Sequence, residues 1–146
     1  MTEQAAKSLA AVLSGDAVFP MPSSRSWGVT ATRTDGRLAV IEDHAGWVYR
    51  DREAYDRYQQ GGDPDAAVEA REWGEGNDGE DWARGLSIVL GSEEYWHSGG
   101  GIWLVFYERP DGRFAVIGSE SGGVYANREE FETDEYGEKA ENHVFV

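Results

Sequence analysis

The sequence predicts an α+β fold in which one α-β-β-β-α unit, with antiparallel hairpins, occurs twice. Three observations lead to this prediction: an internal repeat, an Asp-Gly pair between two apolar runs in each copy, and apolar residues at helical spacing ahead of each pair. A three-stranded unit buries too little surface to be stable alone. We therefore expect the two copies to share one core with pseudo-two-fold symmetry.

The internal repeat is clearest in the middle of each copy. With a shift of 76 positions, residues 29–58 align with residues 105–134 and share 13 identities in 30 positions. Unrelated sequences of ordinary composition would share about two. The identical runs include Asp-Gly-Arg at residues 35–37 and 111–113. Upstream, a fainter match continues with a shift of 77 positions. This change of shift indicates that one residue was gained or lost between the helix and the hairpin of one copy.

Each copy is expected to begin with a helix. Leu9, Val12 and Leu13 recur at helical spacing, and Gly15 marks the expected end of this helix. Residues 82–90 repeat the pattern and Gly91 follows them.

A hairpin and a third strand are expected after each helix. The Asp-Gly pair suits a tight turn with a positive φ angle at the glycine. The predicted strands cover residues 27–33, 37–42 and 47–49 in the first copy, and 102–109, 113–118 and 123–125 in the second. A short helix follows each third strand, capped by Asp51 or Asn127. We expect the third strands to offer edges for pairing with another copy of the chain, so a homodimer is possible.

The predicted organisation has four parts. Residues 1–60 form the first copy and residues 82–136 the second. Residues 61–81 are an acidic, Gly/Asp-rich connector with a short helix expected from Asp65 through Trp73. Residues 137–146 are a tail whose end, 144–146, is expected to pack as a late strand.

Composition limits the possible functions. The net charge is −15, from 28 acidic and 13 basic residues, and this charge disfavours direct binding of nucleic acid or an anionic membrane. The six Trp and the hydrophobic content of 40% are typical of a folded chain and not of a disordered one. There is no Cys, no apolar run long enough for a membrane span, and no basic, apolar start typical of a signal peptide. We expect a soluble, cytoplasmic protein.

No motif predicts catalysis, a cofactor or a metal. His44, His97 and His143 each stand alone, without metal-ligand spacing. The glycine-rich segments 98–101 and 119–123 lack the spacing of phosphate-binding loops and of a nucleophile elbow, so both are interpreted as loops. Residues 77–81 resemble only a fragment of a calcium loop, and a solvated turn is the preferred interpretation. If a symmetric cleft existed, Glu53 and Glu129, which occupy equivalent positions in the two copies, would be the first candidates for catalytic residues.

Basic residues flank both Asp-Gly turns in equivalent places. Arg33 and Arg37 bracket the first turn, and Arg109 and Arg113 bracket the second. We expect these four side chains to bridge to nearby carboxylates, with docking of a partner at the two turns as the alternative.

Acidic residues gather in two stretches, 63–94 and 120–141. Such clusters are often no more than solvated surface. The alternative is that they form two folded ridges that present carboxylates to a basic protein. Trp73, Trp82 or Tyr136 are candidate aromatic anchors beside them. The predicted partner-binding residues are Asp63, Asp65, Glu69, Glu72, Glu75, Asp78, Glu80, Asp81, Glu129, Glu130, Glu132, Asp134, Glu135 and Trp73.

These features lead to a functional hypothesis. We expect a non-enzymatic inhibitor that binds a basic nucleic-acid-binding protein by mimicking the charge of a nucleic acid. A small, acidic, aromatic-containing folded protein is similar in type to the phage and mobile-element inhibitors of restriction and CRISPR systems, although no motif assigns the chain to such a family. Two alternatives stay open: an immunity or antitoxin protein that neutralises a basic toxin, and a salt-adapted acidic module.

Overall fold

The computed structural model describes residues 1–62, 66–74 and 78–145, which form a mixed α+β fold. The described residues contain four helices and two antiparallel five-stranded sheets. The elements in chain order are α1 (Glu3–Leu13), β1 (Asp16–Val18), β2 (Gly28–Thr32), β3 (Leu38–Ile41), β4 (Ala45–Tyr49), α2 (Arg52–Gln59), β5 (Ala67–Glu72), α3 (Glu80–Leu90), β6 (Tyr95–His97), β7 (Trp103–Glu108), β8 (Phe114–Ile117), β9 (Ser121–Tyr125), α4 (Arg128–Glu132) and β10 (Glu141–Val144).

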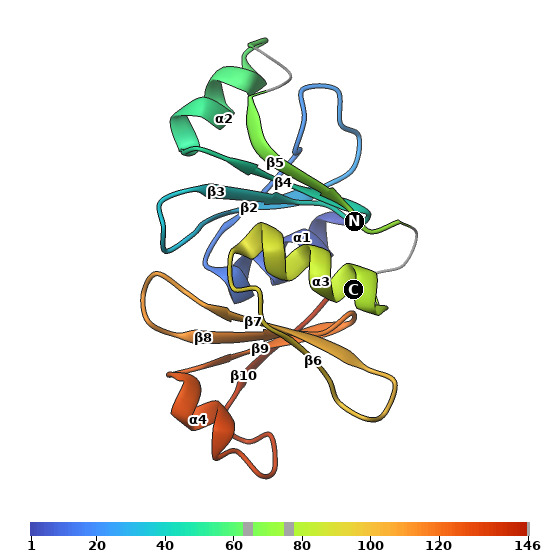
Figure 1. Cartoon of the computed structure of the whole chain (residues 1–146), viewed down its shortest axis with the longest axis vertical. Helices are drawn as coiled ribbons and strands as arrows, with labels where there is room; N and C mark the ends of the chain where they lie inside the picture. The colour runs from blue at the N-terminus through green and yellow to red at the C-terminus, as the bar shows by residue number, and fades with distance from the viewer. Residues whose placement is uncertain (63–65, 75–77, 146) are drawn as a thin grey trace.

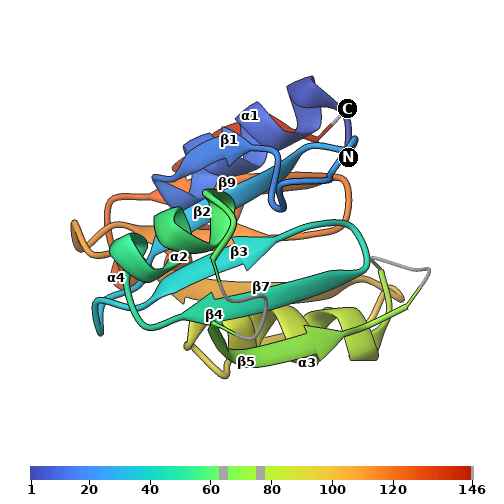
Figure 2. The same ribbon diagram turned by 90° about the horizontal axis from the view of Figure 1, so that it is seen from above.

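The elements stack in layers (Figure 1). One sheet has the strand order β1-β2-β3-β4-β5 and the other β10-β9-β8-β7-β6. Helices α1 and α3 lie between the two sheets, while α2 and α4 cover their outer faces. Seen from above, α1 lies near β1 and β9, and α3 lies beneath β5 at the other side of the layer (Figure 2).

The Asp-Gly turns have the predicted geometry. Gly36 and Gly112 have φ angles of 86° and 85°, which glycine adopts without the steric cost of a Cβ atom. In each turn the arginine before the Asp-Gly pair donates its backbone N–H to the carbonyl of the arginine after it, at 2.8 Å for both Arg33–Arg37 and Arg109–Arg113. The four hairpin strands predicted from the sequence are confirmed to within one residue at each end.

The helix ends also follow local chemistry. The side chains of Asp51 and Asn127 accept hydrogen bonds from the backbone N–H groups of Ala54 and Glu130, which confirms both as N-caps. Helix α3 ends at Gly91, whose φ angle is 81°. Helix α1 ends one residue earlier than expected, because Ser14 and not Gly15 takes the left-handed conformation, with a φ angle of 59°.

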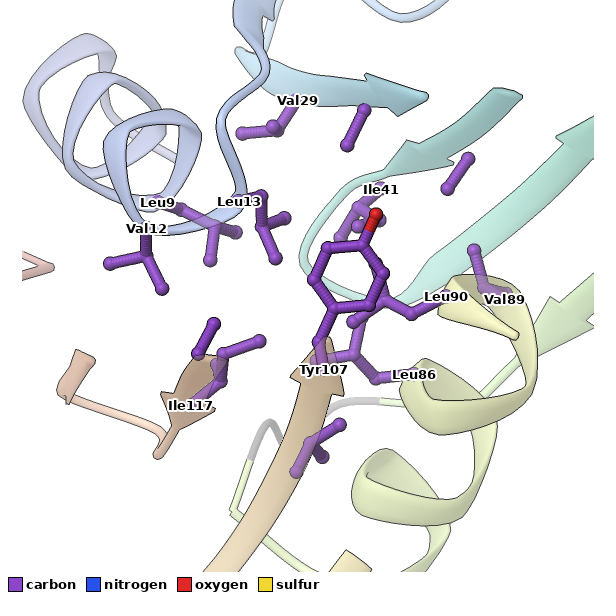
Figure 3. Packing of buried hydrophobic residues seen from close by; sticks show 14 of the residues in the cluster. Leu9, Val12, Leu13, Val29, Ile41, Leu86, Val89, Leu90, Tyr107 and Ile117 are labelled. Atoms are coloured by element: carbon purple, nitrogen blue, oxygen red, sulfur yellow. The ribbon is translucent and has the colours of Figure 1, made fainter. Parts of the chain in front are cut away.

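The central core lies between the sheets and is shared by both halves of the chain. Leu9, Val12 and Leu13 of α1 and Leu86, Val89 and Leu90 of α3 meet side chains of both sheets there (Figure 3). Each fully buried aliphatic side chain contributes about 2 kcal/mol to the free energy of unfolding. Two smaller clusters lie under α2 and α4, one around Tyr49 and Tyr55 and the other around Phe106 and Phe114.

Four sequence predictions need correction, because the sheets contain strands that were not expected. Residues 67–72 form strand β5 and not a helix, since pairing with β4 outweighs the weak helix preference of this short segment. Strand β1 extends the first three-stranded unit and β6 extends the second. Each has only three residues, too few to show the two-residue alternation of a strand in the sequence. The late strand comprises Glu141–Val144, earlier than the predicted 144–146. The third strands, β4 and β9, offer no free edge because β5 and β10 cover them.

Candidate functional site

One acidic feature of the surface is the segment 129–138, which we call the acidic tip. It comprises α4 after its first residue and the start of the connection to β10, and it projects beyond the outer face of the second sheet (Figure 1). Its side chains include the predicted partner-binding residues Glu129, Glu130, Glu132, Asp134 and Glu135.

The base of the acidic tip is anchored by an aromatic cluster. Phe131 of α4 packs against Phe106, Phe114 and Tyr125, with ring centroids 5.3–5.4 Å apart. The guanidinium of Arg128 lies over the Phe114 ring, 4.6 Å from its centroid. Arg128 also makes a bidentate ion pair with Glu94, and this pairing holds the pKa of Glu94 below its ordinary value. The helix is therefore fixed to the sheet despite its short length.

The loop of the acidic tip is folded back on Asp134. The carboxylate of Asp134 accepts hydrogen bonds from the backbone N–H groups of Glu138, at 3.0 Å, and Lys139, at 3.3 Å. The Lys139 ammonium donates to the Thr133 hydroxyl at 2.9 Å. Tyr136 belongs to the same loop, and 81% of its surface is exposed. The tip therefore carries exposed carboxylates and an exposed tyrosine on a segment that these hydrogen bonds restrain.

The other predicted ridge lies on β5 and the first turn of α3, and we call it the β5–α3 rim. Glu69 pairs with Arg71 at 2.8 Å, and Glu80 and Asp81 pair with Arg84 at 2.9 and 3.5 Å. Glu80 and Asp81 also suit the positive end of the helix dipole. Glu72 and Asp78 are exposed. The predicted residues Asp63, Asp65 and Glu75 lie outside the described residues.

The β5–α3 rim belongs to the first sheet and the helix layer, whereas the acidic tip lies beyond the outer face of the second sheet (Figure 1). The acidic tip lies outside β9 and β8, whereas the rim lies along the free edge of β5. The structure brings Glu129, Glu130, Glu132, Asp134 and Glu135 together, and separately Glu69, Glu72, Glu80 and Asp81. They form two surfaces and not one continuous face.

Trp73 and Trp82 do not stand on the surface as partner anchors would need to. Trp73 is 7% exposed, belongs to the central core, and donates its Nε1–H to the carbonyl of Asp43 at 2.7 Å. Its ring fills the space left by Gly46 and Gly85, where an added Cβ would lie 3.0 and 2.7 Å from ring atoms. Of the three candidate anchors, only Tyr136 is exposed.

Most arginines are engaged by the chain's own carboxylates. The structural interpretation of Arg33 and Arg109 agrees with their contacts: each pairs with the aspartate of its own turn and reaches the end of a helix from the other half of the chain. The ion-paired arginines are Arg33, Arg50, Arg52, Arg57, Arg71, Arg84, Arg109, Arg113 and Arg128. Both lysines also pair with glutamates. The excess charge on the surface is therefore carried by carboxylates.

The three histidines have separate surroundings. His44 Nδ1 lies 2.9 Å from the carbonyl of Gly74, His143 Nε2 lies 3.2 Å from Glu141, and the His97 ring packs on Trp103 with centroids 4.7 Å apart. Within the described ranges, no group of three His, Cys, Asp or Glu side chains could hold a metal ion. Among the same residues, no helix is long and apolar enough to cross a membrane.

Comparison of the chain with protein-family models, with curated proteins and with solved structures gave no significant match.

Proposed function

We propose that this protein is a non-enzymatic acidic inhibitor that binds a basic protein at a site where that partner otherwise binds nucleic acid. The observation that supports this most is the acidic tip. Glu129, Glu132, Glu135 and Tyr136 are all exposed on this segment, and the Asp134 hydrogen bonds hold the loop in place. Tyrosine is enriched at protein interfaces, where it often acts as an anchor, and polar or charged residues form the surrounding border of the contact.

The restrained conformation of the acidic tip favours a role in binding a partner over a role in solubility alone. Carboxylates on a mobile segment lose conformational entropy when a partner captures them, and this loss reduces affinity. Here Phe131 and Asp134 already restrict the segment before binding. A solvated acidic surface that served only solubility would need neither contact.

Long-range electrostatics favour a basic partner. With a net charge of −15 and most of its arginines held in internal ion pairs, the chain attracts cationic surfaces and repels nucleic acid. Any link to nucleic acid is therefore indirect, through competition for the same basic site. Such association is fast at low salt and weakens steeply as ionic strength rises.

The β5–α3 rim is the weaker candidate surface. Three of its acids, Glu69, Glu80 and Asp81, have partners within the chain, and two of these also stabilise the start of α3. We therefore assign the primary contact to the acidic tip and treat the rim as a comparison surface.

We also propose that the fold arose by duplication, with pseudo-two-fold symmetry between the halves. The order of elements from α1 to β5 recurs from α3 to β10. Arg33 contacts the carbonyl of Val89 near the end of α3, and Arg109 contacts the carbonyl of Val12 near the end of α1. Arg52 pairs with Asp16, just as Arg128 pairs with Glu94. These reciprocal contacts support a common origin of the two halves.

The test is a tagged pull-down from a bacterial cytoplasmic extract, since we propose that the protein acts in the cytoplasm. Bound proteins are released by rising salt or by added duplex DNA. Recovery of a basic nuclease or other nucleic-acid-binding protein that DNA displaces supports the proposal. A basic toxin that DNA does not displace would indicate an immunity function instead, and no basic partner at low salt would contradict both.

A charge-matched pair of variants separates the tip from total charge. Glu129→Lys, Glu132→Lys and Glu135→Lys together should weaken capture of the partner at least about tenfold. The control carries Glu53→Lys, Glu72→Lys and Asp78→Lys, three exposed acids outside the tip. Equal losses in both variants would show that capture reflects net charge and not this surface.

A further inference from the structure

A cavity of about 380 Å³ opens at one end of the helix layer, away from the acidic tip. Its walls come from the first halves of α1 and α3, from the end of β3 with the residues after it, and from the end of β8 with the residues after it. Small-molecule sites are typically 300–1,000 Å³ and form where separate structural layers meet. This cavity meets both conditions.

The walls of the cavity are mainly apolar. Leu9, Ile41, Trp82, Leu86 and Ile117 line it, and all five belong to the central core. Figure 3 shows Leu9, Ile41, Leu86 and Ile117 on four different elements around the space between the sheets. An apolar group that filled this space would gain dispersion contacts and remove apolar surface from water.

Glu42 and Asp43 make the cavity polar on one side. Glu42 lines the cavity, and its backbone N–H is fixed by a hydrogen bond to the carbonyl of Ala45 at 2.9 Å. Burial raises the pKa of Glu42 above its ordinary value, against the opposing effects of the Met1 amino group and His44. The neighbouring Asp43 pairs with the Met1 amino group at 2.8 Å. Among the contacts of the described residues, none holds the Glu42 carboxylate.

We propose that this cavity binds a small hydrophobic amine, with its ring or chain against Leu9, Trp82 and Leu86 and its ammonium group on Glu42. A cation at this point would pair with a carboxylate that is only partly hydrated, and such charge-assisted hydrogen bonds are the strong ones. The negative field of the whole chain also favours a cationic ligand and disfavours an anion of the same shape. This site is independent of the inhibitor function proposed above.

Three ligands of matched shape test the charge requirement: 2-phenylethylamine, 2-phenylethanol and phenylacetate. Each is titrated into the full chain, and binding is followed by the methyl NMR signals of Leu9, Leu86 and Ile117. We expect saturable shifts with the amine, binding at least tenfold weaker with the alcohol, and none with the acid. Equal affinity of amine and alcohol, or no shift of these methyl groups with any ligand, would overturn the proposal.

Two substitutions test the residues. Glu42→Gln should reduce amine affinity to that of the alcohol and leave alcohol affinity unchanged, whereas the control Glu53→Gln, on α2, should change neither. Ala5→Leu places a larger side chain from α1 into the cavity and should abolish binding of both ligands. If Ala5→Leu fails to fold, which circular dichroism would reveal, the Glu42→Gln comparison still decides the matter: unchanged preference for the amine contradicts the proposal.

Discussion

The guanidinium of Arg33 donates from Nη1 to the carbonyl of Val89 at 3.2 Å, and so ties the turn of the first hairpin to the last turn of α3. The reciprocal contact joins Arg109 to the carbonyl of Val12 in α1, at 3.4 Å. In both cases a cation meets the negative end of a helix dipole, where carbonyl groups lack partners. The tyrosine hydroxyl of Tyr107 adds a third link, since it donates to the carbonyl of Thr32 at 3.1 Å. These contacts couple the halves of the chain into one folding unit.

Removing one of these arginines should destabilise the whole chain. Arg109 is 8% exposed and also pairs with Asp111, so Arg109→Ala leaves helix carbonyls and a carboxylate without their donor. We expect a loss of about 2 kcal/mol in the free energy of unfolding, measured by urea denaturation. The partly exposed Arg113 pairs with Glu141 on the surface, and Arg113→Ala should cost less than about 1 kcal/mol. Equal costs would contradict a structural role specific to Arg109.

Alkaline pH should weaken the fold through buried tyrosines. Burial raises the pKa of Tyr107 and of Tyr49 to about 12, while unfolded tyrosine ionises near 10. Because the unfolded state loses these protons first, stability is fully present below about pH 10 and is lost as pH rises toward 12. Absorbance of tyrosinate should show Tyr107 and Tyr49 among the late-titrating groups, together with Tyr55 and Tyr125, whose pKa burial also raises. Tyr107→Phe should remove one late group and flatten the pH dependence of stability; titration of all seven tyrosines near 10 would contradict this.

Trp73 should behave as a core residue. Trp73→Ala removes a ring that packs against Gly46 and Gly85 and should cost about 3–5 kcal/mol of stability. Trp96 is 53% exposed on β6, so Trp96→Ala should change stability by less than about 0.5 kcal/mol. Thermal unfolding of both variants measures the difference. A small loss of stability in Trp73→Ala would contradict the assignment of Trp73 to the core and would make it a candidate anchor again.

Asp134 should control the order of the acidic tip. Asp134→Ala removes the acceptor for the backbone N–H groups of Glu138 and Lys139, so their amide hydrogens should exchange faster. The global free energy of unfolding should fall by only about 1 kcal/mol. Hydrogen exchange followed by NMR resolves these amides, with Asn142 on β10 as an internal control. Unchanged exchange at both positions would mean that other contacts hold the loop.

Local chemistry explains which elements could be predicted from the sequence. Asp35-Gly36 and Asp111-Gly112 determine turn type, hairpin register and strand boundaries within a few residues, so the hairpins were predictable. Asp51 and Asn127 marked the starts of α2 and α4 for the same reason. Strand β5 was not predictable, because its residues have no strong strand preference and only pairing with β4 makes them extended.

The candidate sites were less accessible to sequence reasoning. Acid-rich segments are visible in a sequence, but the sequence does not separate Glu80 and Asp81, which stabilise the start of α3, from Glu132 and Glu135 on the tip. Trp73 looked like an anchor because tryptophan near acids is common at interfaces, yet its burial depends on α3 packing against β4 and β5. Glu42 went unnoticed because the cavity beside it is assembled from residues far apart in the chain.

The most direct test of the central claim is a competition measurement. The basic partner recovered by pull-down is bound to fluorescently labelled duplex DNA, and unlabelled protein is titrated in while fluorescence anisotropy is recorded. The account predicts complete release of the DNA by the natural protein, with a midpoint at least about tenfold higher for the triple tip variant than for its charge-matched control. Simultaneous binding of DNA and this protein to the partner, or identical midpoints for the two variants, would contradict it.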